Sequence, residues 1–392
     1  PEGITLRSMV LTPRQGPGSN HFGAVSGGCG IAVLAILGDP GTDSELLEKY
    51  LAALERAVVR HFLAGWGDGG YYKEGWGASR VGTQGGFLSF LQALKVARGR
   101  DYLNVERTNA SYVTMVPRCL LVLGPPGYFP YRSNMGPTYG NPEIGNIDQR
   151  SGMSSGGYFS EGFGAVADRH KPGLLWTYNH IFNADGKDVF DTYSLYPHRP
   201  MLALVNWPTF SGIEEKNPAE VMPLATRDRL YEFFAFRNRF SGPADVVTTV
   251  LIKLPDGTKP REVMVWGMNG LRLGFGEPQL GAAVSRWATA ADGSGMLTAG
   301  RFSMVVDHSR ASGADVLVAT TGGGVPKLDV SKTGGRAAYT PLQLGEATVH
   351  VLSLHPEGKH PQPQVRGDAI VAGDQRITLK DGHLTLEKFT AR

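Results

Sequence analysis

The stretch GDGGYYKEGWGASR, residues 67–80, is the richest part of the chain in chemically capable side chains. It combines aromatic rings, phenols and charges of both signs, carried by Asp68, Tyr71, Tyr72, Lys73, Glu74, Trp76 and Arg80. Aromatic faces stack on sugar rings, and loops held between helices are where binding residues concentrate. We therefore expect this loop to bind a substrate. The alternative is a connecting loop with its aromatic side chains folded underneath.

A second stretch, GSNHFGAVSGGCG (residues 18–30), places Asn20 and His21 in front of side chains that are almost all small or apolar. Small residues let backbones approach closely. The stretch therefore predicts a helix that packs tightly behind its start, with Asn20 and His21 projecting into a groove.

Three other places hold candidate residues. His180, in LLWTYNHIFN, is flanked by Tyr178 and Asn179, which makes it the best candidate for a second catalytic histidine. Tyr158, in GGYFSEGFGAVA, is a candidate for substrate binding. His61 lies on the apolar side of its helix and is expected in the core. In FFAFRNRF, Arg237 and Arg239 are expected on one face of a strand, where they would meet an acidic glycan or simply solvent.

The segments NHFGAVSGGCGIAVLAILGD and DGGYYKEGWG, the latter followed by GFLSFLQAL, resemble the heparinase II/III-like polysaccharide lyases. The resemblance covers most of the first 210 residues and extends to the second half only in architecture. It implies an (α/α) toroid followed by a large antiparallel β-sandwich. Because the toroid of that family normally has helices upstream of these segments, we expect upstream sequence to be missing or the toroid to be reduced.

The chemistry that the resemblance implies is β-elimination from a uronic acid. Its Asn-His pair, here Asn20 and His21, would neutralise the uronate carboxylate and assist proton transfer. Preorganised donors can hold the developing negative charge, and Arg80 also suits carboxylate recognition. A base must take the C5 proton and an acid must reach the leaving oxygen. His and Tyr serve both ends when their pKa values are tuned. We assign catalysis to His21, Tyr72 and His180, and substrate binding to Asn20, Glu74, Trp76, Arg80 and Tyr158.

One position departs from the family pattern. The catalytic tyrosine usually follows the Glu-Gly in an EGxGY context, but this chain has EGWGAS, with Ala78 in that place. Three explanations compete: Tyr71 or Tyr72 supplies the phenol, the chain is an inactivated variant, or the branch never used this acid. We favour Tyr72. Two other functions stay open, a catalytically silent carbohydrate-binding or structural protein and a uronate C5-epimerase, which returns the proton and leaves chain length intact.

No cofactor is indicated clearly. Many relatives bind zinc through a His-x-His and Asp pattern, which is missing here. The candidate ligands are separated along the chain as His170, His180, His198, Asp185, Asp188 and Asp191. We expect no organic cofactor, and a divalent metal, zinc or calcium, stays possible without a clear pattern to support it.

The first half of the chain predicts helices. TDSELLEKYLAALERAVVRHF has apolar residues at helical spacing and a capping box from Thr42 to Glu45. GFLSFLQALKVARG (86–99) repeats this pattern and stops at a glycine. Shorter helical candidates follow, and antiparallel pairs in sequence suggest an α/α array.

The second half changes to the period of strands. Runs such as RFSMVVDHS, ADVLVATTG and ATVHVLSLH are strand-like, and Asp381-Gly382 lies between two alternating segments, which is a strong hairpin signal. Helices followed by strands predict an α+β chain of two domains. We place a helical, incomplete toroid-like domain at 1–210 and an antiparallel β-sandwich at 211–392, with the boundary near Pro208 to Pro223.

Composition limits the partners. The 392 residues carry a formal net charge of +3 and contain 41% hydrophobic and 19% charged residues, which fits an ordinary globular protein. No basic run argues for nucleic acid, and no apolar run reaches the roughly 18 residues of a membrane span. The two cysteines are expected as buried free thiols, with one disulfide as the alternative. We expect a secreted or periplasmic protein whose partner is an acidic polysaccharide.

Overall fold

A computed structural model describes most of the chain. The described residues are 16–73, 86–103, 110–123, 128–129, 145–146, 159–187, 189–190, 199–253, 263–279, 281–326 and 328–389. The chain divides into two compact units. The helical unit comprises Pro1–Met222 and Asp228–Leu230, and the strand unit comprises Pro223–Arg227 and Tyr231–Arg392. Among the described residues there are seven α-helices and three larger antiparallel sheets, so the α+β prediction is confirmed at this level. A closed or partial toroid stays a prediction.

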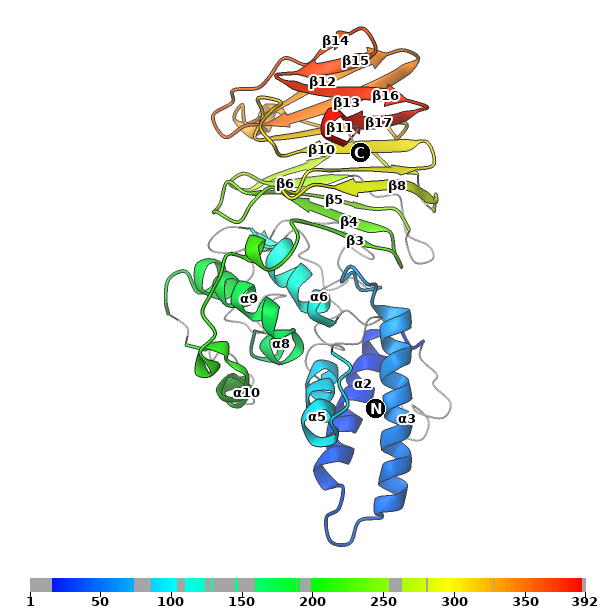
Figure 1. The fold of residues 1–392 in the computed structure, drawn as a ribbon, viewed down its shortest axis with the longest axis vertical. Coiled ribbons are helices and arrows are strands. Elements are labelled where there is room, and N and C mark those ends of the chain that lie inside the picture. The colour runs from blue at the N-terminus through cyan, green and yellow to red at the C-terminus, as the bar shows by residue number, and fades with distance from the viewer. Residues whose placement is uncertain are drawn as a thin grey trace. The chain divides into compact units, whose positions relative to one another are not determined.

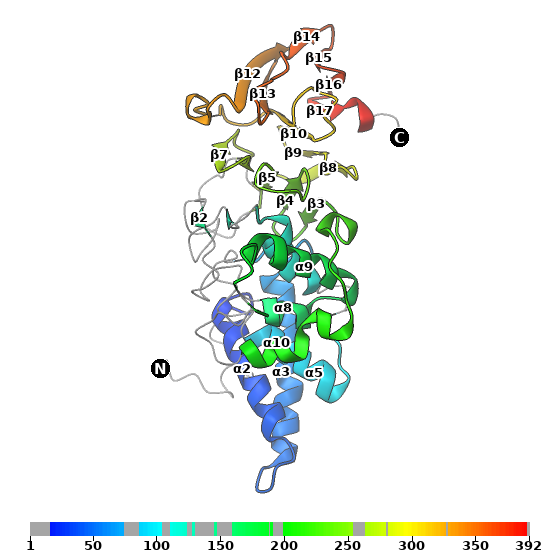
Figure 2. The same ribbon diagram turned by 90° about the vertical axis from the view of Figure 1, so that its left-hand side faces the viewer.

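Two long helices open the helical unit. They are α2 (Asn20–Ile36) and α3 (Ser44–Gly65), which lie side by side in Figures 1 and 2. The hydroxyl of Ser19 caps α2 by accepting a hydrogen bond from the Phe22 amide at 3.1 Å. The predicted capping box of α3 is wrong by one residue: Asp43 is the N-cap and accepts from the Leu46 amide, while the Thr42 hydroxyl donates to the Asp39 carbonyl. A carboxylate at this position satisfies the same free amides.

Glycines set the distance between α2 and α5 (Leu88–Arg98). A Cβ on Gly27 would stand 2.5 Å from the backbone of Gly86 and Phe87, and one on Gly30 would overlap the ring of Phe90. Gly28, one position along, faces open space. The prediction that small residues allow tight packing behind the helix start is therefore confirmed.

The rest of the helical unit consists of short elements. The helices are α6 (Ala110–Met115), α8 (Phe159–Ala165), α9 (Lys171–Thr177) and α10 (Arg199–Asn206). Two π-helical turns extend them, η2 (Val116–Leu120) after α6 and η5 (Tyr178–Phe182) after α9. Short 3-10 turns complete the unit at η4 (Asp168–His170), η6 (Pro208–Ser211) and η7 (Pro218–Glu220). A two-stranded ribbon pairs β1 (Tyr128–Phe129) with β2 (Gly145–Asn146).

Three antiparallel sheets form the strand unit. The first runs in the order β3 (Ala225–Asp228), β4 (Phe233–Arg237), β5 (Val246–Leu251), β6 (Met264–Gly267), β7 (Leu271–Gly274). The second has the order β12 (Ala337–Leu344), β13 (Ala347–Leu354), β11 (Val316–Thr321), β10 (Phe302–Asp307), β9 (Gly295–Ala299), β8 (Val284–Thr289). The third contains β14 (Gln364–Arg366), β15 (Ala369–Ala372), β16 (Gln375–Lys380) and β17 (His383–Leu386).

The inner strands β9, β10 and β11 of the six-stranded sheet are buried on both faces, because two cores lie against the sheet. Alternation along β10 sends Met304 and Val306 into the core shared with the first sheet, and Val305 into the core shared with the third. This explains why every residue of β10 is buried. The strand unit thus has three sheets and two cores (Figure 1), one layer more than a simple sandwich.

The predicted hairpin at Asp381-Gly382 is confirmed. Both residues have positive φ, 52° and 77°, and Lys380 pairs with His383 across a two-residue loop. This is the backbone that an Asp-Gly loop favours between twisted antiparallel strands.

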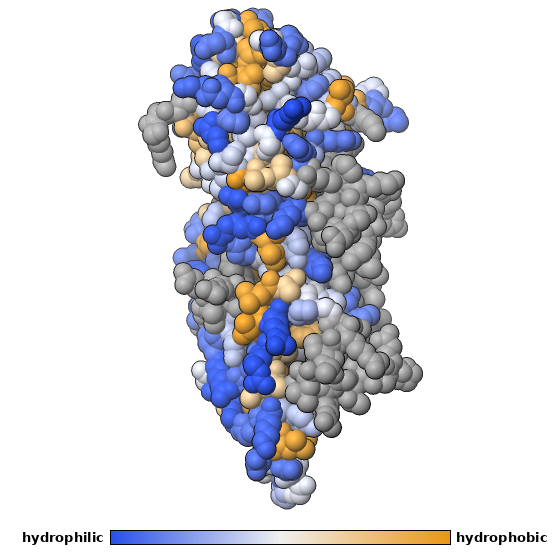
Figure 3. Space-filling view, turned by 90° about the vertical axis from the view of Figure 1, so that its right-hand side faces the viewer, coloured by the Kyte–Doolittle hydropathy of each residue, from blue (hydrophilic) through white to orange (hydrophobic). Residues whose placement is uncertain are grey.

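Surface and thiol features complete the description. Cys29 is half-buried and Cys119 fully buried, both as free thiols, so the disulfide alternative is wrong. In the part of the chain that is described, no helix has the length and apolar character needed to cross a bilayer. Hydrophilic residues cover much of the face drawn in Figure 3, with apolar residues in separate groups.

Candidate functional site

The first cluster of candidate residues begins at the N-terminus of α2. Asn20 is partly exposed and His21 exposed, while Phe22 directly after them is buried. Phe22 anchors the helix start, because its ring stacks on that of His61 from α3, with the ring centroids 6.0 Å apart. Asn20 and His21 are therefore presented from a rigid support, which is the arrangement that precise recognition requires.

Beneath the helix start lies an aromatic layer. The His61 ring meets Phe87 edge-on at 4.6 Å and lies 6.1 Å from the ring of Tyr72. Tyr72 in turn contacts Trp66, with the two ring centroids 4.7 Å apart. His61, Tyr72 and Phe87 are all completely buried. The prediction that His61 belongs to the core is confirmed.

The imidazole of His61 is a buried titratable group. Its Nδ1 lies 2.7 Å from the carbonyl oxygen of Pro17, to which the N–H form donates. Burial lowers the pKa of His61 to about 4, and outweighs this hydrogen bond, which acts in the opposite direction. His61 is therefore neutral at pH 7.

The loop that contains Tyr71 and Tyr72 is pinned by Asp228, which is also completely buried. One carboxylate oxygen of Asp228 accepts hydrogen bonds from the amides of Gly69 and Tyr71, at 3.2 and 2.9 Å. Asp68 accepts from the backbone and side chain of Arg229. A side chain on Gly67 would collide with the Asp228 carboxylate, which explains the glycine there.

Tyr71 and Tyr72 are both fully buried, which is the arrangement of the alternative in which the aromatic side chains fold beneath the loop. Their rings fold under the loop, because burying the large apolar area of each ring in the core is more favourable than exposing it to water. A proton-transfer role for Tyr72 would have to operate from inside the aromatic layer. That role stays a prediction, and the burial argues for another proton-transfer group.

The second cluster surrounds His180 on η5. His180 Nε2 lies 2.7 Å from Glu215 Oε1, and the Asn179 amide donates to the other carboxylate oxygen, also at 2.7 Å. The Trp176 ring stacks on the imidazole, with centroids 4.6 Å apart and planes 21° apart. The side chain of His180 is 48% exposed, so the imidazole is both oriented and accessible.

The carboxylate of Glu215 is held in its charged form. Partial burial raises the pKa of Glu215, but the hydrogen bonds from Asn179 and His180 outweigh it and leave the pKa below its ordinary value. A carboxylate that fixes one nitrogen of an imidazole also stabilises the imidazolium that forms when the ring takes up a proton. The pair is therefore suited to general acid–base chemistry.

The two clusters are built from different elements. The helix α2 packs on α3 and α5, whereas α9, which leads into η5, packs on η2, η4 and η7. Asn20, His21 and the aromatic layer are brought together, and His180 groups instead with Trp176, Asn179 and Glu215. Glu74, Trp76, Arg80 and Tyr158, together with Ala78, lie outside the described residues.

The candidate metal ligands do not converge where the structure describes them. His170 is buried, with its pKa lowered to about 4 by burial and by the nearby charge of Arg169. His180 pairs with Glu215 and Asp185 with Lys187. Asp188, Asp191 and His198 fall outside the described residues. Across the described ranges, no group of three His, Cys, Asp or Glu side chains could hold a metal ion. The described members of this set do not fit a zinc site, and no chemical step is assigned to a metal.

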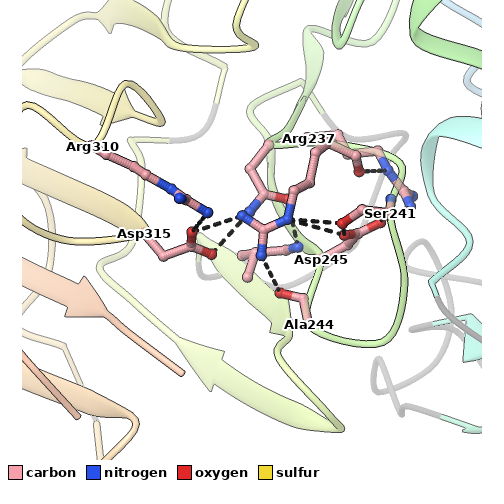
Figure 4. Close-up of polar contacts among 9 residues, drawn as sticks. Arg237, Ser241, Ala244, Asp245, Arg310 and Asp315 are labelled. Carbon is pink, nitrogen blue, oxygen red and sulfur yellow. Dashed lines mark hydrogen bonds and ion pairs between the residues drawn. The ribbon is translucent and has the colours of Figure 1, made fainter. Parts of the chain in front are cut away.

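Arg237 and Arg239 take part in an ion-pair network instead of meeting solvent. Figure 4 shows Arg237 and Ser241 converging on Asp245, while Arg310 reaches Asp315. Arg237 Nη2 lies 2.9 Å from Asp245 Oδ2, with both side chains buried, and Arg239 bridges Asp245 and Asp315. The expected solvated face is wrong, because two buried aspartates need these cations.

Some of these residues could be predicted from the sequence and others could not. Trp176 precedes His180 by four positions, a helical spacing that places two rings on one face. Glu215 and Asp228 were missed, because neither stands at a regular spacing from the groups it holds. Comparison with known proteins adds no further assignment: no protein-family model, curated protein or solved structure matches the chain.

Proposed function

We propose that this protein is a polysaccharide lyase of the heparinase II/III-like type, which cleaves a uronic-acid-containing glycan by β-elimination. The observation that carries the proposal is the accessible His180, oriented by the charged Glu215 and stacked on Trp176. Further support comes from Asn20 and His21, presented from the rigid start of α2, and from the sequence resemblance around them. The same proposal makes the protein secreted or periplasmic, with an acidic polysaccharide as partner.

The proposed roles follow from the chemistry of each group. The proposal requires a single uronate to reach both clusters, with Asn20 and His21 donating hydrogen bonds to its carboxylate so that negative charge can develop at C5. His180 takes the C5 proton, and Glu215 stabilises the resulting imidazolium. The bond from C4 to the glycosidic oxygen then breaks, a C4–C5 double bond forms, and the His180 imidazolium returns its proton to the leaving oxygen. Elimination needs no organic cofactor for these steps.

The test is an ultraviolet assay for the unsaturated uronate product on alginate, glucuronan, ulvan, heparin and chondroitin. We expect signal on at least one polymer, and a loss of at least tenfold in kcat for His180→Ala and for His21→Ala. Glu215→Gln keeps a hydrogen-bond acceptor but removes the charge, so we expect an intermediate loss.

Ser19→Ala is the matched control for His21→Ala. It removes the cap of the same helix, at about 1 kcal/mol of stability, but leaves His21 in place. Activity that survives Ser19→Ala, despite the lower stability of that variant, and is lost in His21→Ala assigns the imidazole to the reaction. Equal losses in both variants would show that His21 acts only through the stability of α2.

A silent carbohydrate-binding protein is the second candidate, and the burial of Tyr72 favours it together with Ala78. Retained glycan binding with no ultraviolet signal, in both the native chain and Ala78→Tyr, would establish this function. A gain of signal in Ala78→Tyr would instead identify a lost phenol. Epimerisation is distinguished by its product, since chain length would stay intact while the uronate changes its C5 configuration.

A further inference from the structure

The helix α10 is apolar on both its inner and its outer side. Ala203 is buried on the inner side, where α10 packs on α8. On the outer side Met201, Leu204 and Val205 are 69%, 72% and 73% exposed. Their i, i+3, i+4 spacing places them in one stripe. A helix that is apolar all round is normally covered on all sides.

Beside this stripe lies an apolar groove between α2, α5 and α10, with a volume of about 540 Å³. Eight residues from the three helices line it: Ile31, Ser89, Gln92, Ala93, Val96, Met201, Leu202 and Val205. The Gln92 amide is already engaged with that of Asn206 on α10. Val96, at the rim, is 80% exposed. The exposed apolar stripe and the apolar groove therefore lie next to each other.

The chemistry of this surface excludes several occupants. No residue from Pro200 to Ile213 carries a charge, so neither an acidic glycan nor a nucleic acid finds an ionic partner on the stripe. Six of the eight described lining residues are apolar, Ser89 and Gln92 are polar, and none of the eight offers an aromatic face on which a sugar would stack. The occupant must itself be apolar and neutral.

We propose that this α10 surface, defined by Ile31, Val96, Met201, Leu204 and Val205, binds the same surface of a second copy of the chain. A two-fold axis would place the stripe of each copy in the groove of the other, which is the self-complementary contact of an isologous dimer. From their fractional exposures, the five side chains offer roughly 600 Å² per copy, or roughly 1,200 Å² in total, which reaches the lower limit of stable interfaces.

Sedimentation equilibrium of the native chain, from about 1 to 100 μM, tests the proposal. We expect a reversible monomer–dimer equilibrium, and a dissociation constant at least tenfold weaker in Leu204→Lys. Leu63→Lys is the matched control: Leu63 is an exposed apolar residue of α3 in the same unit, 53% exposed, and its substitution should leave dimerisation unchanged. Circular dichroism and melting temperature verify that both variants fold.

Three outcomes would overturn the proposal. One is a native chain that stays monomeric at 100 μM. Another is dimerisation that Leu204→Lys and Leu63→Lys weaken equally. The third is a monomeric chain that binds vesicles of neutral phosphatidylcholine in an α10-dependent manner, which would assign the surface to a bilayer instead.

Discussion

Among the single residues, His61 couples the stability of the helical unit to pH. Its pKa is about 4 in the folded chain, because burial disfavours the charged form, and about 6.5 in the unfolded chain. Between these values the unfolded chain binds a proton that the folded chain does not. The contribution of His61 to the free energy of unfolding is therefore complete above pH 6.5 and is lost as the pH falls towards 4.

We expect His61→Phe to reduce this pH dependence. From pH 7 to pH 4.5 the free energy of unfolding of the native chain should fall by roughly 2–3 kcal/mol more than that of the variant. Urea unfolding at both pH values measures it. His170 has a similarly low pKa but is present in both proteins, so its contribution cancels. Parallel losses in the two proteins would show that His61 is not the coupled group.

At this scale the sequence predicts side chains whose partners are close along the chain. The helical position of His61 was enough to place it in the core. The environments of Tyr71 and His180 depended on Asp228 and Glu215, which are brought to them only by the fold. The local sequence does not distinguish a buried phenol from an exposed one in a glycine-rich loop, because the carboxylate that holds the loop is distant along the chain.

Between elements, α2 approaches the start of α5 closely. Gly27→Ala would place a Cβ 2.5 Å from the backbone of Gly86 and Phe87, so the two elements must separate. We expect a loss of about 1–3 kcal/mol in unfolding free energy. Gly28→Ala adds the same atom one residue later in open space, and should stabilise the helix by about 0.5–1 kcal/mol. Chemical denaturation of the pair measures both, and effects of equal sign would refute the packing argument.

A buried ion pair connects β4 to the turn before β5. Removing one partner leaves an uncompensated buried charge, so Asp245→Ala should cost about 3–5 kcal/mol. Asp368→Ala breaks the exposed pair with Arg376 and should change stability by less than about 1 kcal/mol. Thermal unfolding of both variants tests this contrast. A mild effect at Asp245 would mean that Arg237 finds another partner or water.

Periodicity predicted elements better than it predicted their ends or their layers. The long α3 and the strands β10, β11 and β13 follow from apolar spacing, and the Asp381-Gly382 loop from its backbone preference. The N-cap of α3 differs by one residue, because Thr42 and Asp43 are both competent caps. The π-helical turns η2 and η5 do not show in the spacing of apolar residues, so this spacing did not predict them.

For the whole molecule, the sequence predicts helices first and strands second, and the structure has a helical unit and a strand unit. It did not predict that the six-stranded sheet has a core on each face. Four of the six residues of β10 are apolar and all six are buried, which is typical of a strand covered on both sides. Whether the helices belong to a toroid depends on long-range packing, to which local spacing is insensitive.

One of the free thiols allows a fluorescent label to be attached to the helix that presents Asn20 and His21. The chain has two cysteines, of which Cys119 is fully buried and Cys29 only half-buried. Burial raises the pKa of Cys29, so alkylation should proceed slowly at neutral pH and faster in mild alkali. A dye on Cys29 would lie on α2, roughly 13 Å along the helix axis from Asn20. Fluorescence from the otherwise unmodified chain would then report when a glycan reaches the helix start, before any bond is broken.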